Sequence, residues 1–301
     1  MLSMVFHKLR FVFYLFLLTI IFLGVERLCH LASDGFAITR ISHNISASVE
    51  AEKTVPSELT TILSQPFSYL ASGAQSYVFV SQDDRYVMKF FKFHHLRIPP
   101  WIDALPTPTF LKAYKAHKVL KKETALQKTL QSYQIAHNLF SSHTALVYLH
   151  LHQTDHLHQT LHLIDKIGIH YKLDADALIF AIQQKGKPLY EGLRAYIKQG
   201  HLDQAKMIIS DVLQIIFERC KQGVGDLDPD FQTNFGIIDG RVKQFDVGRF
   251  YIDSKEKDPE IYARELYRIT RAFKSWLEEN SPELAVYLEQ ELQVIQGSVI
   301  L

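Results

Sequence analysis

The residues best suited to chemistry in this chain gather between positions 225 and 250, in the stretch GDLDPDFQTNFGIIDGRVKQFDVGRF. The stretch holds five aspartates and one asparagine, and two short apolar runs flank its Asp239-Gly240 dipeptide. Asp-Gly between apolar runs is typical of a tight β-hairpin turn. The pattern therefore predicts a hairpin whose open end brings Asn234 and Asp246 together.

Carboxylate and amide oxygens are the ligands that Mg²⁺ prefers, with few supplied by the protein and the rest by water and phosphate. Asn234 and Asp246 are therefore candidate metal ligands. Asp226 lies upstream, after the end of a predicted helix, where it can approach the same point. A carboxylate there that does not bind the metal can orient a hydroxyl and accept its proton.

Hydrophobic periodicity predicts the elements that must position these residues. We expect strands at 77–80, 86–91, 235–238 and 242–245, helices at 110–140, 189–198 and 202–221, and mostly helix after residue 248. On the first helix, Glu123 shares the predicted apolar face with Leu126, Leu130 and Tyr133. A carboxylate on such a face needs a partner, because an unpaired buried charge is costly.

At these residues the chain resembles the protein-kinase-like superfamily, in particular its aminoglycoside phosphotransferase and small-molecule kinase branch. GDLDP, residues 225–229, is similar to the catalytic loop of that family, which implies that Asp226 is the catalytic aspartate. Asn234 matches the family's metal-binding asparagine. Asp246 opens Asp-Val-Gly, which resembles the Asp-Phe-Gly metal motif.

Upstream, residues 70–78 resemble a degenerate glycine-rich loop with Gly73 at its centre. Tyr-Val-Met-Lys, ending at Lys89, resembles the Val-Ala-Ile-Lys strand of the family. The resemblance implies that Lys89 positions phosphate and that Glu123 is its partner, while residues 186–189 form the hinge. These elements keep the family's order over roughly residues 65–255.

The resemblance implies an α+β, two-lobed protein-kinase-like fold, with an N-terminal antiparallel sheet plus helix over 61–187 and a minimal helical C-terminal lobe over 188–301. It implies ATP and Mg²⁺ as cofactors. The implied function is transfer of the ATP γ-phosphoryl group to a hydroxyl of an unidentified small-molecule or protein acceptor.

The chain also departs from the family's pattern. Ala71 and Ser76 replace the outer glycines of the loop. Three extra residues precede Asn234, so Asp228 or Asp230 is an alternative to Asp226 as the acting carboxylate. An insertion, RIPPWIDALPTPT, follows Lys89, and no Ala-Pro-Glu motif follows the metal motif. An inactive pseudokinase that binds nucleotide or a partner is therefore the alternative, and an unrelated α+β protein whose acidic hairpin binds calcium or nothing is the third.

The amino terminus carries a membrane-targeting pattern. Residues 11–25 contain no charge and follow His7, Lys8 and Arg10. We predict an anchor or signal over 1–27 that contacts the lipid bilayer through 9–25, and favour an uncleaved anchor although the run is shorter than the usual 20 residues or so. The preceding positive charge predicts a single-pass protein with a cytoplasmic N-terminus, which would place the domain outside, where ATP is scarce. Residues 28–60 are expected to be a tether.

Composition excludes some functions. The 301 residues are 47% hydrophobic and carry a formal charge of +1, so nothing global indicates nucleic acid as a partner. Two cysteines, Cys29 and Cys220, give neither a disulfide framework nor a thiol metal motif. The His-rich stretch at 150–162 admits a metal site, but its alternation with leucine favours a half-exposed strand pair with the imidazoles on the wet face.

Overall fold

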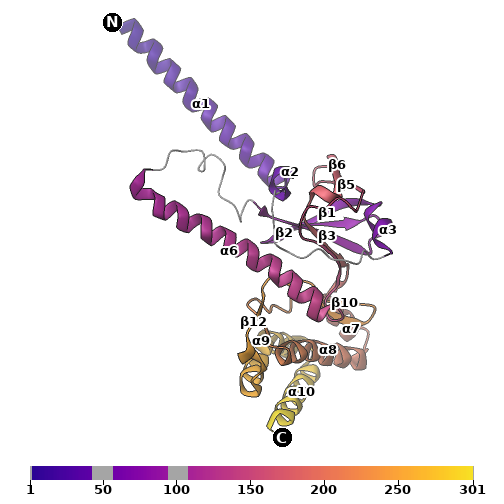
Figure 1. Cartoon of the computed structure of the whole chain (residues 1–301). Coiled ribbons are helices and arrows are strands. Elements are labelled where there is room, and N and C mark those ends of the chain that lie inside the picture. Colours follow the sequence, from indigo (N-terminus) through magenta and orange to yellow (C-terminus); the bar gives the residue numbers. More distant parts are fainter. Residues whose placement is uncertain (1, 43–56, 94–107, 301) are drawn as a thin grey trace.

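The computed structural model describes residues 2–42, 57–93 and 108–300. It is a mixed α+β arrangement in which a seven-stranded sheet with one long helix precedes a helical C-terminal region (Figure 1). This arrangement is consistent with the kinase-like fold expected from the sequence. Residues 43–56 of the predicted tether, and residues 94–107, which hold most of the predicted insertion, lie outside the described residues.

The sheet has the strand order β4-β7-β3-β2-β1-β5-β6. Its centre is an antiparallel meander, and only the pairing of β1 with β5 is parallel. Its strands are β1 (Pro66–Ser72), β2 (Ser76–Ser81), β3 (Tyr86–Phe91), β4 (Leu146–His150), β5 (Thr160–Ile164), β6 (His170–Asp174) and β7 (Phe180–Gln184).

Aromatic side chains hold one face of the sheet together. Phe79, Phe90 and Phe180 lie on three neighbouring strands and are each fully buried. Phe79 meets Phe90 edge to face at 5.7 Å between ring centroids, and Phe90 lies 6.2 Å from Phe180. Rings of this size bury large apolar areas, so they fix the register that places Lys89 at the middle of β3.

Helix α6 (Thr109–Phe140) crosses the sheet domain and reaches the C-terminal region (Figure 1). Its carboxyl half packs through Leu126, Leu130, Tyr133 and Phe140, all buried. Residues 112–124 of its amino half include no buried side chain.

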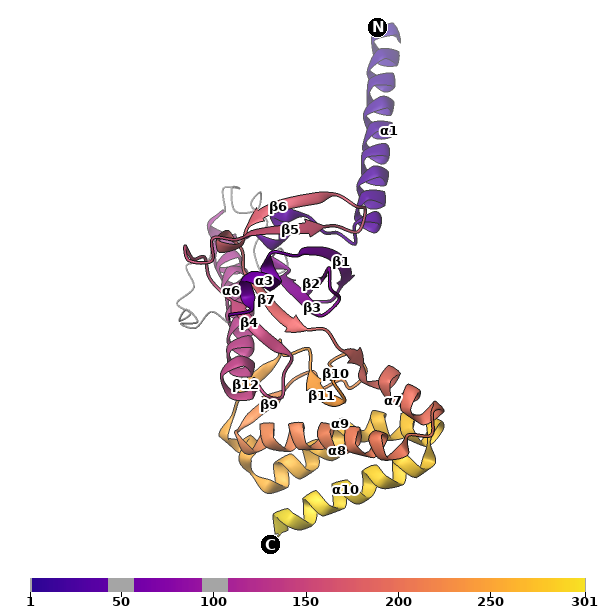
Figure 2. The same ribbon diagram turned by 90° about the vertical axis from the view of Figure 1, so that its right-hand side faces the viewer.

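The C-terminal region is built on a second core of helices and a small hairpin (Figure 2). Apolar residues at helical spacing on α8 and α9, such as Ile208, Val212, Leu266 and Phe273, form this core. Its elements are β8 (Lys187–Pro188), α7 (Leu189–Lys198), α8 (Leu202–Lys221), β9 (Val224–Asp226), β10 (Phe235–Ile238), β11 (Arg241–Gln244), β12 (Phe250–Ile252), α9 (Pro259–Asn280) and α10 (Pro282–Ile300).

Helix α1 (Leu2–Ala32) projects from the rest of the molecule in both views (Figures 1 and 2). Its segment Phe13–Ala32, 20 residues with a mean hydropathy of 1.9, is long and apolar enough to cross a membrane. This test rests on length and composition alone, which a signal sequence also satisfies.

The chain that follows α1 is part of the sheet domain. Phe36 is 6% exposed and meets Tyr77 and Phe79 edge to face, and Ile41, at the end of α2 (Ile38–Ile41), is fully buried. The Tyr77 hydroxyl donates to the Gly35 carbonyl oxygen at 2.6 Å. The expectation of one continuous tether over 28–60 is therefore wrong for this part, because its apolar residues find a place in the core.

The His-rich stretch is not the half-exposed strand pair expected from its alternation. His150 ends β4 with 2% exposure, and its Nδ1 lies 2.6 Å from the Leu178 carbonyl oxygen. Residues 151–159 form a loop before β5. Within the described ranges, no group of three or more His, Cys, Asp or Glu side chains is placed to hold a metal ion.

Candidate functional site

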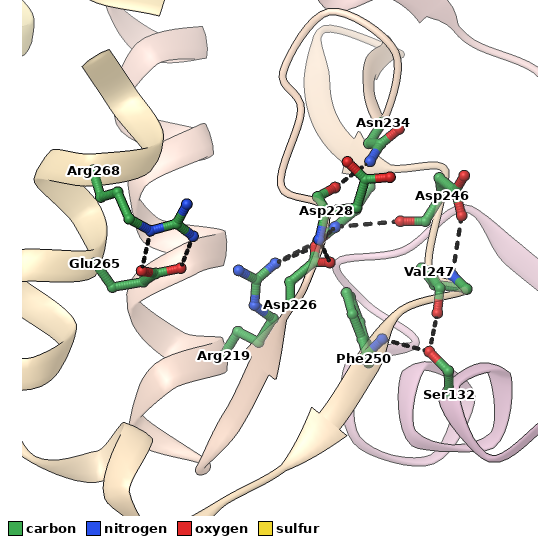
Figure 3. Close-up of polar contacts among 12 residues, drawn as sticks. Ser132, Arg219, Asp226, Asp228, Asn234, Asp246, Val247, Phe250, Glu265 and Arg268 are labelled. Atoms are coloured by element: carbon green, nitrogen blue, oxygen red, sulfur yellow. Dashed lines mark hydrogen bonds and ion pairs between the residues drawn. The ribbon is translucent and has the colours of Figure 1, made fainter. Parts of the chain in front are cut away.

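The β10–β11 hairpin brings Asn234 and Asp246 together at its open end (Figure 3). Asp239 and Gly240, both with positive φ, form its turn. At the other end, the amides of Phe245 and Asp246 donate to the Asn234 carbonyl oxygen at 2.6 and 3.4 Å. The geometry that the Asp-Gly turn predicted is thus the one observed.

The oxygen atoms at this end suit a hard cation. One carboxylate oxygen of Asp246 accepts from the Gly248 amide at 3.0 Å, which leaves the other directed away from that turn. The Asn234 amide nitrogen donates to the Asp228 carbonyl oxygen at 2.5 Å, and its Oδ1 accepts from Thr233 while keeping a second lone pair. Two such oxygens fit Mg²⁺, which takes few ligands from protein and the rest from phosphate and water.

Asp226 is buried and already bonded. Its side chain is 2% exposed and lies 3.2 Å from the Arg219 guanidinium. Gln244 Nε2 donates to the same carboxylate at 2.8 Å, and the Asp228 amide donates to its other oxygen at 3.0 Å. Burial raises the pKa of Asp226, and Arg219 opposes this shift. The expectation that Asp226 approaches an acceptor hydroxyl is contradicted, because both oxygens are turned into the protein.

The two alternates are both exposed but differ in their contacts. Asp230 closes its own turn: its carboxylate accepts from the Gln232 amide and the Thr233 hydroxyl. The Asp228 side chain is 56% exposed, and its only contact among the described ion pairs is with Arg249 at 3.8 Å. Asp228 also lies beside Asn234 and Asp246 in Figure 3, and its carboxylate is exposed there.

Lys89 is directed at the Asp-Val-Gly segment that begins at Asp246. Its Nζ donates at 2.9 Å to the Phe245 carbonyl oxygen, immediately before Asp246. Gln183 on β7 donates to the same carbonyl, also at 2.9 Å. Burial lowers the pKa of Lys89, while the Asp246 carboxylate acts in the opposite direction. An ammonium group at this position is near any phosphate that binds beside Asp246.

The expected pairing of Lys89 with Glu123 is wrong. Glu123 is exposed on the amino half of α6, and no ion pair joins the two side chains in the described ranges. Packing of α6 against the sheet begins only at Leu126, so Glu123 lies beyond the contact. Where α6 passes the Asp-Val-Gly segment it carries Ser132, whose hydroxyl donates to the Val247 carbonyl oxygen.

The turn between β1 and β2 covers the site. The Gly73 amide donates to the Ser76 carbonyl oxygen at 2.9 Å, and Lys92 Nζ donates to the Gly73 carbonyl oxygen at 2.5 Å. Gln75, also in this turn, has a buried Oε1 without a hydrogen-bond partner. A Cβ placed on Gly248 would lie 2.3 Å from that oxygen, so this turn and the Asp-Val-Gly segment are in close contact.

The predicted hinge at 186–189 connects the sheet to α7. The Phe245 ring packs against its first glycine: a Cβ on Gly186 would lie 2.5 Å from that ring, and one on Gly236 would lie 2.0 Å from it. Neither position accommodates a larger residue without movement of the ring. The absence of side chains at these two glycines therefore leaves room for the Phe245 ring between the hinge and β10.

The sequence reasoning missed two residues that hold the site in place. Ser132 accepts from the Phe250 amide at 2.5 Å in addition to its bond to Val247, and so fixes both ends of the turn after Asp246. Arg219 binds Asp226 and donates to Gln244 Oε1 at 3.0 Å. A signal for Arg219 existed, since it falls on the apolar stripe of α8.

A groove of about 1120 Å³ borders the turn after Asp246. It runs between α6 and β12, and its lining includes Gln131, Leu227, Gly248, Arg249 and Tyr251. Leu227 is 69% exposed there. The open side of the candidate site thus continues into a space large enough for a second molecule.

Comparison with known proteins assigns no family. No family model matches the chain, and no curated protein matches it significantly. Among solved structures, a crystal structure of WbdD matches with a TM-score of 0.36 and 12% identity, over 77% of this chain and 51% of that one. A second, described as the bifunctional kinase-methyltransferase WbdD, matches with 0.35 and 13%, over 75% and 48%. This chain thus spans about half the length of the WbdD chains.

A complex of Rv3197 with erythromycin from Mycobacterium tuberculosis also matches, with a TM-score of 0.34 and 12% identity over 81% of this chain and 76% of that one. All three are distant similarities in backbone structure. They assign this protein neither a family nor an activity.

Proposed function

We propose that this protein is a membrane-anchored, kinase-like phosphotransferase that binds MgATP at the Lys89–Asp246 site and transfers the γ-phosphoryl group to a hydroxyl. The observation that carries the proposal is the convergence of Lys89 on β3 with Asn234 and Asp246 at the two ends of the β10–β11 hairpin: Lys89 Nζ and the Asn234 backbone both reach the Phe245–Asp246 peptide. Lysine with two hard oxygen ligands is a set suited to a metal-bound polyphosphate.

In this proposal Asn234 and Asp246 hold Mg²⁺, which neutralises charge on the phosphates when it is bound. Lys89 contacts phosphate, and the Gly73 turn covers it. Asp228 accepts the proton of the acceptor hydroxyl as its oxygen bonds to the γ-phosphorus and the bond to the bridging oxygen breaks, which releases ADP. Asp226 instead acts through Arg219 and Gln244 to hold the loop that carries Asp228. The groove beside Gly248 gives the acceptor a route to the base.

The proposed anchor is α1, whose apolar side chains from Phe13 to Leu31 are exposed. Exposure of this apolar helix surface to water is unfavourable, so we expect Phe13–Ala32 to lie in a bilayer. Because residues 34–41 pack into the sheet, the anchor would hold the domain close to the membrane.

A second function, nucleotide binding without catalysis, is favoured by one observation. The Lys89 ammonium has a carbonyl oxygen in place of a glutamate partner, and Glu123 is the only acidic residue of α6. In protein kinases that ion pair must form for activity. Binding without turnover would decide for this alternative.

The test is release of ADP from MgATP by the full chain in detergent, with water as the default acceptor. Asp228→Asn keeps the shape of the side chain but removes the base, so we expect turnover to fall about 100- to 1000-fold with little change in ATP affinity. Asp230→Asn is the matched control in the same loop and should change turnover less than twofold. Equal loss in both variants, or loss only in Asp230→Asn, contradicts the assignment, and ATP binding without turnover in wild type supports the second function.

A further inference from the structure

Helix α6 changes character along one side. In its carboxyl half that side carries Leu126, Tyr133, Ala136 and Phe140, all buried. An α-helix turns by about 100° per residue, so the same side can be followed towards the amino end. Over residues 112–118, the side chains on it are three lysines and Tyr114. The side that packs on the sheet in one half of the helix therefore becomes positively charged where the helix extends past the sheet.

The positive charge of this amino half is concentrated. Five lysines fall within about half of the helix surface, and one acidic residue, Glu123, lies at the edge of that half. The five are Lys112, Lys115, Lys118, Lys121 and Lys122. For the whole chain the formal charge is only +1, so this segment is a local exception. Its charge requires an explanation that overall composition does not give.

The amino half also has unburied apolar groups, and no side chain of residues 112–124 is buried against the described part of the chain. Tyr114 is 61% exposed and Leu120 is 62% exposed. A helical segment of this length is only marginally stable in water when nothing packs against it. A surface that binds it would therefore also stabilise it.

The position of the segment indicates which surface that is. In both views, α1 and the amino end of α6 lie on the side of the molecule away from α10 (Figures 1 and 2). A membrane that α1 enters would thus lie on the side to which the amino half of α6 extends. Lysines with an interfacial tyrosine are suited to anionic lipid headgroups.

We propose that the amino half of α6, residues 112–124, binds the anionic headgroups of the membrane that α1 enters. This inference rests on the anchor in the proposed function and is independent of phosphotransfer. Bound in this way, α6 would attach the domain to the membrane at a second point. The carboxyl half of the same helix holds the turn after Asp246 through Ser132, so one helix would connect the membrane surface to the candidate site.

The test is hydrogen exchange of the full chain in nanodiscs of phosphatidylcholine alone and of phosphatidylcholine with phosphatidylglycerol at about 7:3. We expect amides of residues 112–124 to exchange about tenfold more slowly in the anionic discs, and about 0.5 M NaCl to remove most of the difference because it screens exposed charges. The variant Lys112→Glu, Lys118→Glu, Lys121→Glu should lose the slowing. Lys198→Glu, Lys221→Glu, Lys255→Glu, with the same change in charge at exposed positions of the C-terminal region, should keep it.

Equal exchange of residues 112–124 in the two kinds of disc overturns the proposal, as does slowing that survives in the Lys112, Lys118, Lys121 variant. Stronger protection by a single-stranded oligonucleotide than by anionic discs also overturns it, in favour of nucleic acid. The anchor hypothesis is tested separately in the same experiment: fast amide exchange of Phe13–Ala32 in both kinds of disc would show that α1 does not enter the membrane.

Discussion

The polar cluster around Asp176 and the polar cluster around Asp246 differ in how far their hydrogen-bonding groups are already used. The Asp176 carboxylate accepts from the Thr154 hydroxyl and from the amides of His156, Leu157 and His158. Thr154 in turn bonds His150. This network fixes the loop between β4 and β5, and leaves Asp176 no capacity for a ligand.

At the other cluster, the Asp246 carboxylate accepts one hydrogen bond among the described residues, from the Gly248 amide, and the Asp228 side chain is 56% exposed. Two buried amide oxygens nearby, those of Gln75 and Gln183, have no hydrogen-bond partner among the described residues. Unused acceptors beside a lysine are what a bound cation or donor would satisfy. A closed polar network indicates a structural role, whereas an open one indicates a place for a ligand.

Asp226 and Arg219 show that the closed kind also occurs inside the Asp-rich stretch. Arg219→Met removes the partner of a buried carboxylate, and we expect the free energy of unfolding to fall by about 3–5 kcal/mol in denaturant titration. The matched control is Arg249→Met, which removes an exposed partner of Asp228 and should cost less than about 1 kcal/mol. A similar loss of unfolding free energy in both variants would contradict the view that Asp226 is held in a buried network whereas Asp228 is not.

Asp176→Asn tests the closed network in the sheet domain. Burial alone would raise the pKa of Asp176, but bonds from Thr154 and the backbone amides of the loop outweigh it and lower the pKa to about 2. A carboxylate with a lowered pKa stabilises the fold at pH above its unfolded value of 3.8 and loses that contribution as pH falls towards 2. We expect the variant to be less stable by about 2 kcal/mol at pH 7.

That difference between wild type and Asp176→Asn should shrink as pH falls from about 4 to 2, measured by urea unfolding at each pH. Asp174→Asn is a control on the neighbouring turn, where the side chain caps only the Asp176 amide. A pH-independent difference would mean that ionisation of Asp176 does not stabilise the loop.

Glu123→Gln is expected to have the smallest effect. The side chain is exposed, and Lys89 bonds to the Phe245 carbonyl oxygen instead of to Glu123, so we expect ATP affinity and turnover within twofold of wild type and stability within about 0.5 kcal/mol. Lys89→Met, by contrast, should weaken ATP binding. If Glu123→Gln weakens binding as much as Lys89→Met does, α6 must rearrange on binding nucleotide.

Much of the fold follows from local patterns. The helices expected at 189–198 and 202–221 have those bounds, and the Asp239-Gly240 turn forms the expected hairpin. Such features depend on periodicity and turn chemistry within a short segment. They could be predicted because few distant residues compete with them.

The inward turn of Asp226 could not be predicted in this way. It follows from pairing of β9 with β12, in which Asp226 opposes Phe250, and from an arginine on α8. The same applies to Glu123, whose exposure depends on where α6 leaves the sheet, and to His150, which is buried by packing on Phe180. In each case a contact with residues distant in sequence decides whether the polar side chain is buried and hydrogen-bonded or remains exposed.

The comparison of the two clusters is tested most directly by thermal unfolding of the full chain with and without MgATP, for wild type, Asp246→Asn and Asp176→Asn. We predict that MgATP raises the melting temperature of wild type and of Asp176→Asn by similar amounts, although Asp176→Asn begins lower, and that Asp246→Asn begins near wild type and gains nothing. A full shift in Asp246→Asn, or no shift in wild type, would contradict the assignment of the open cluster as the MgATP site.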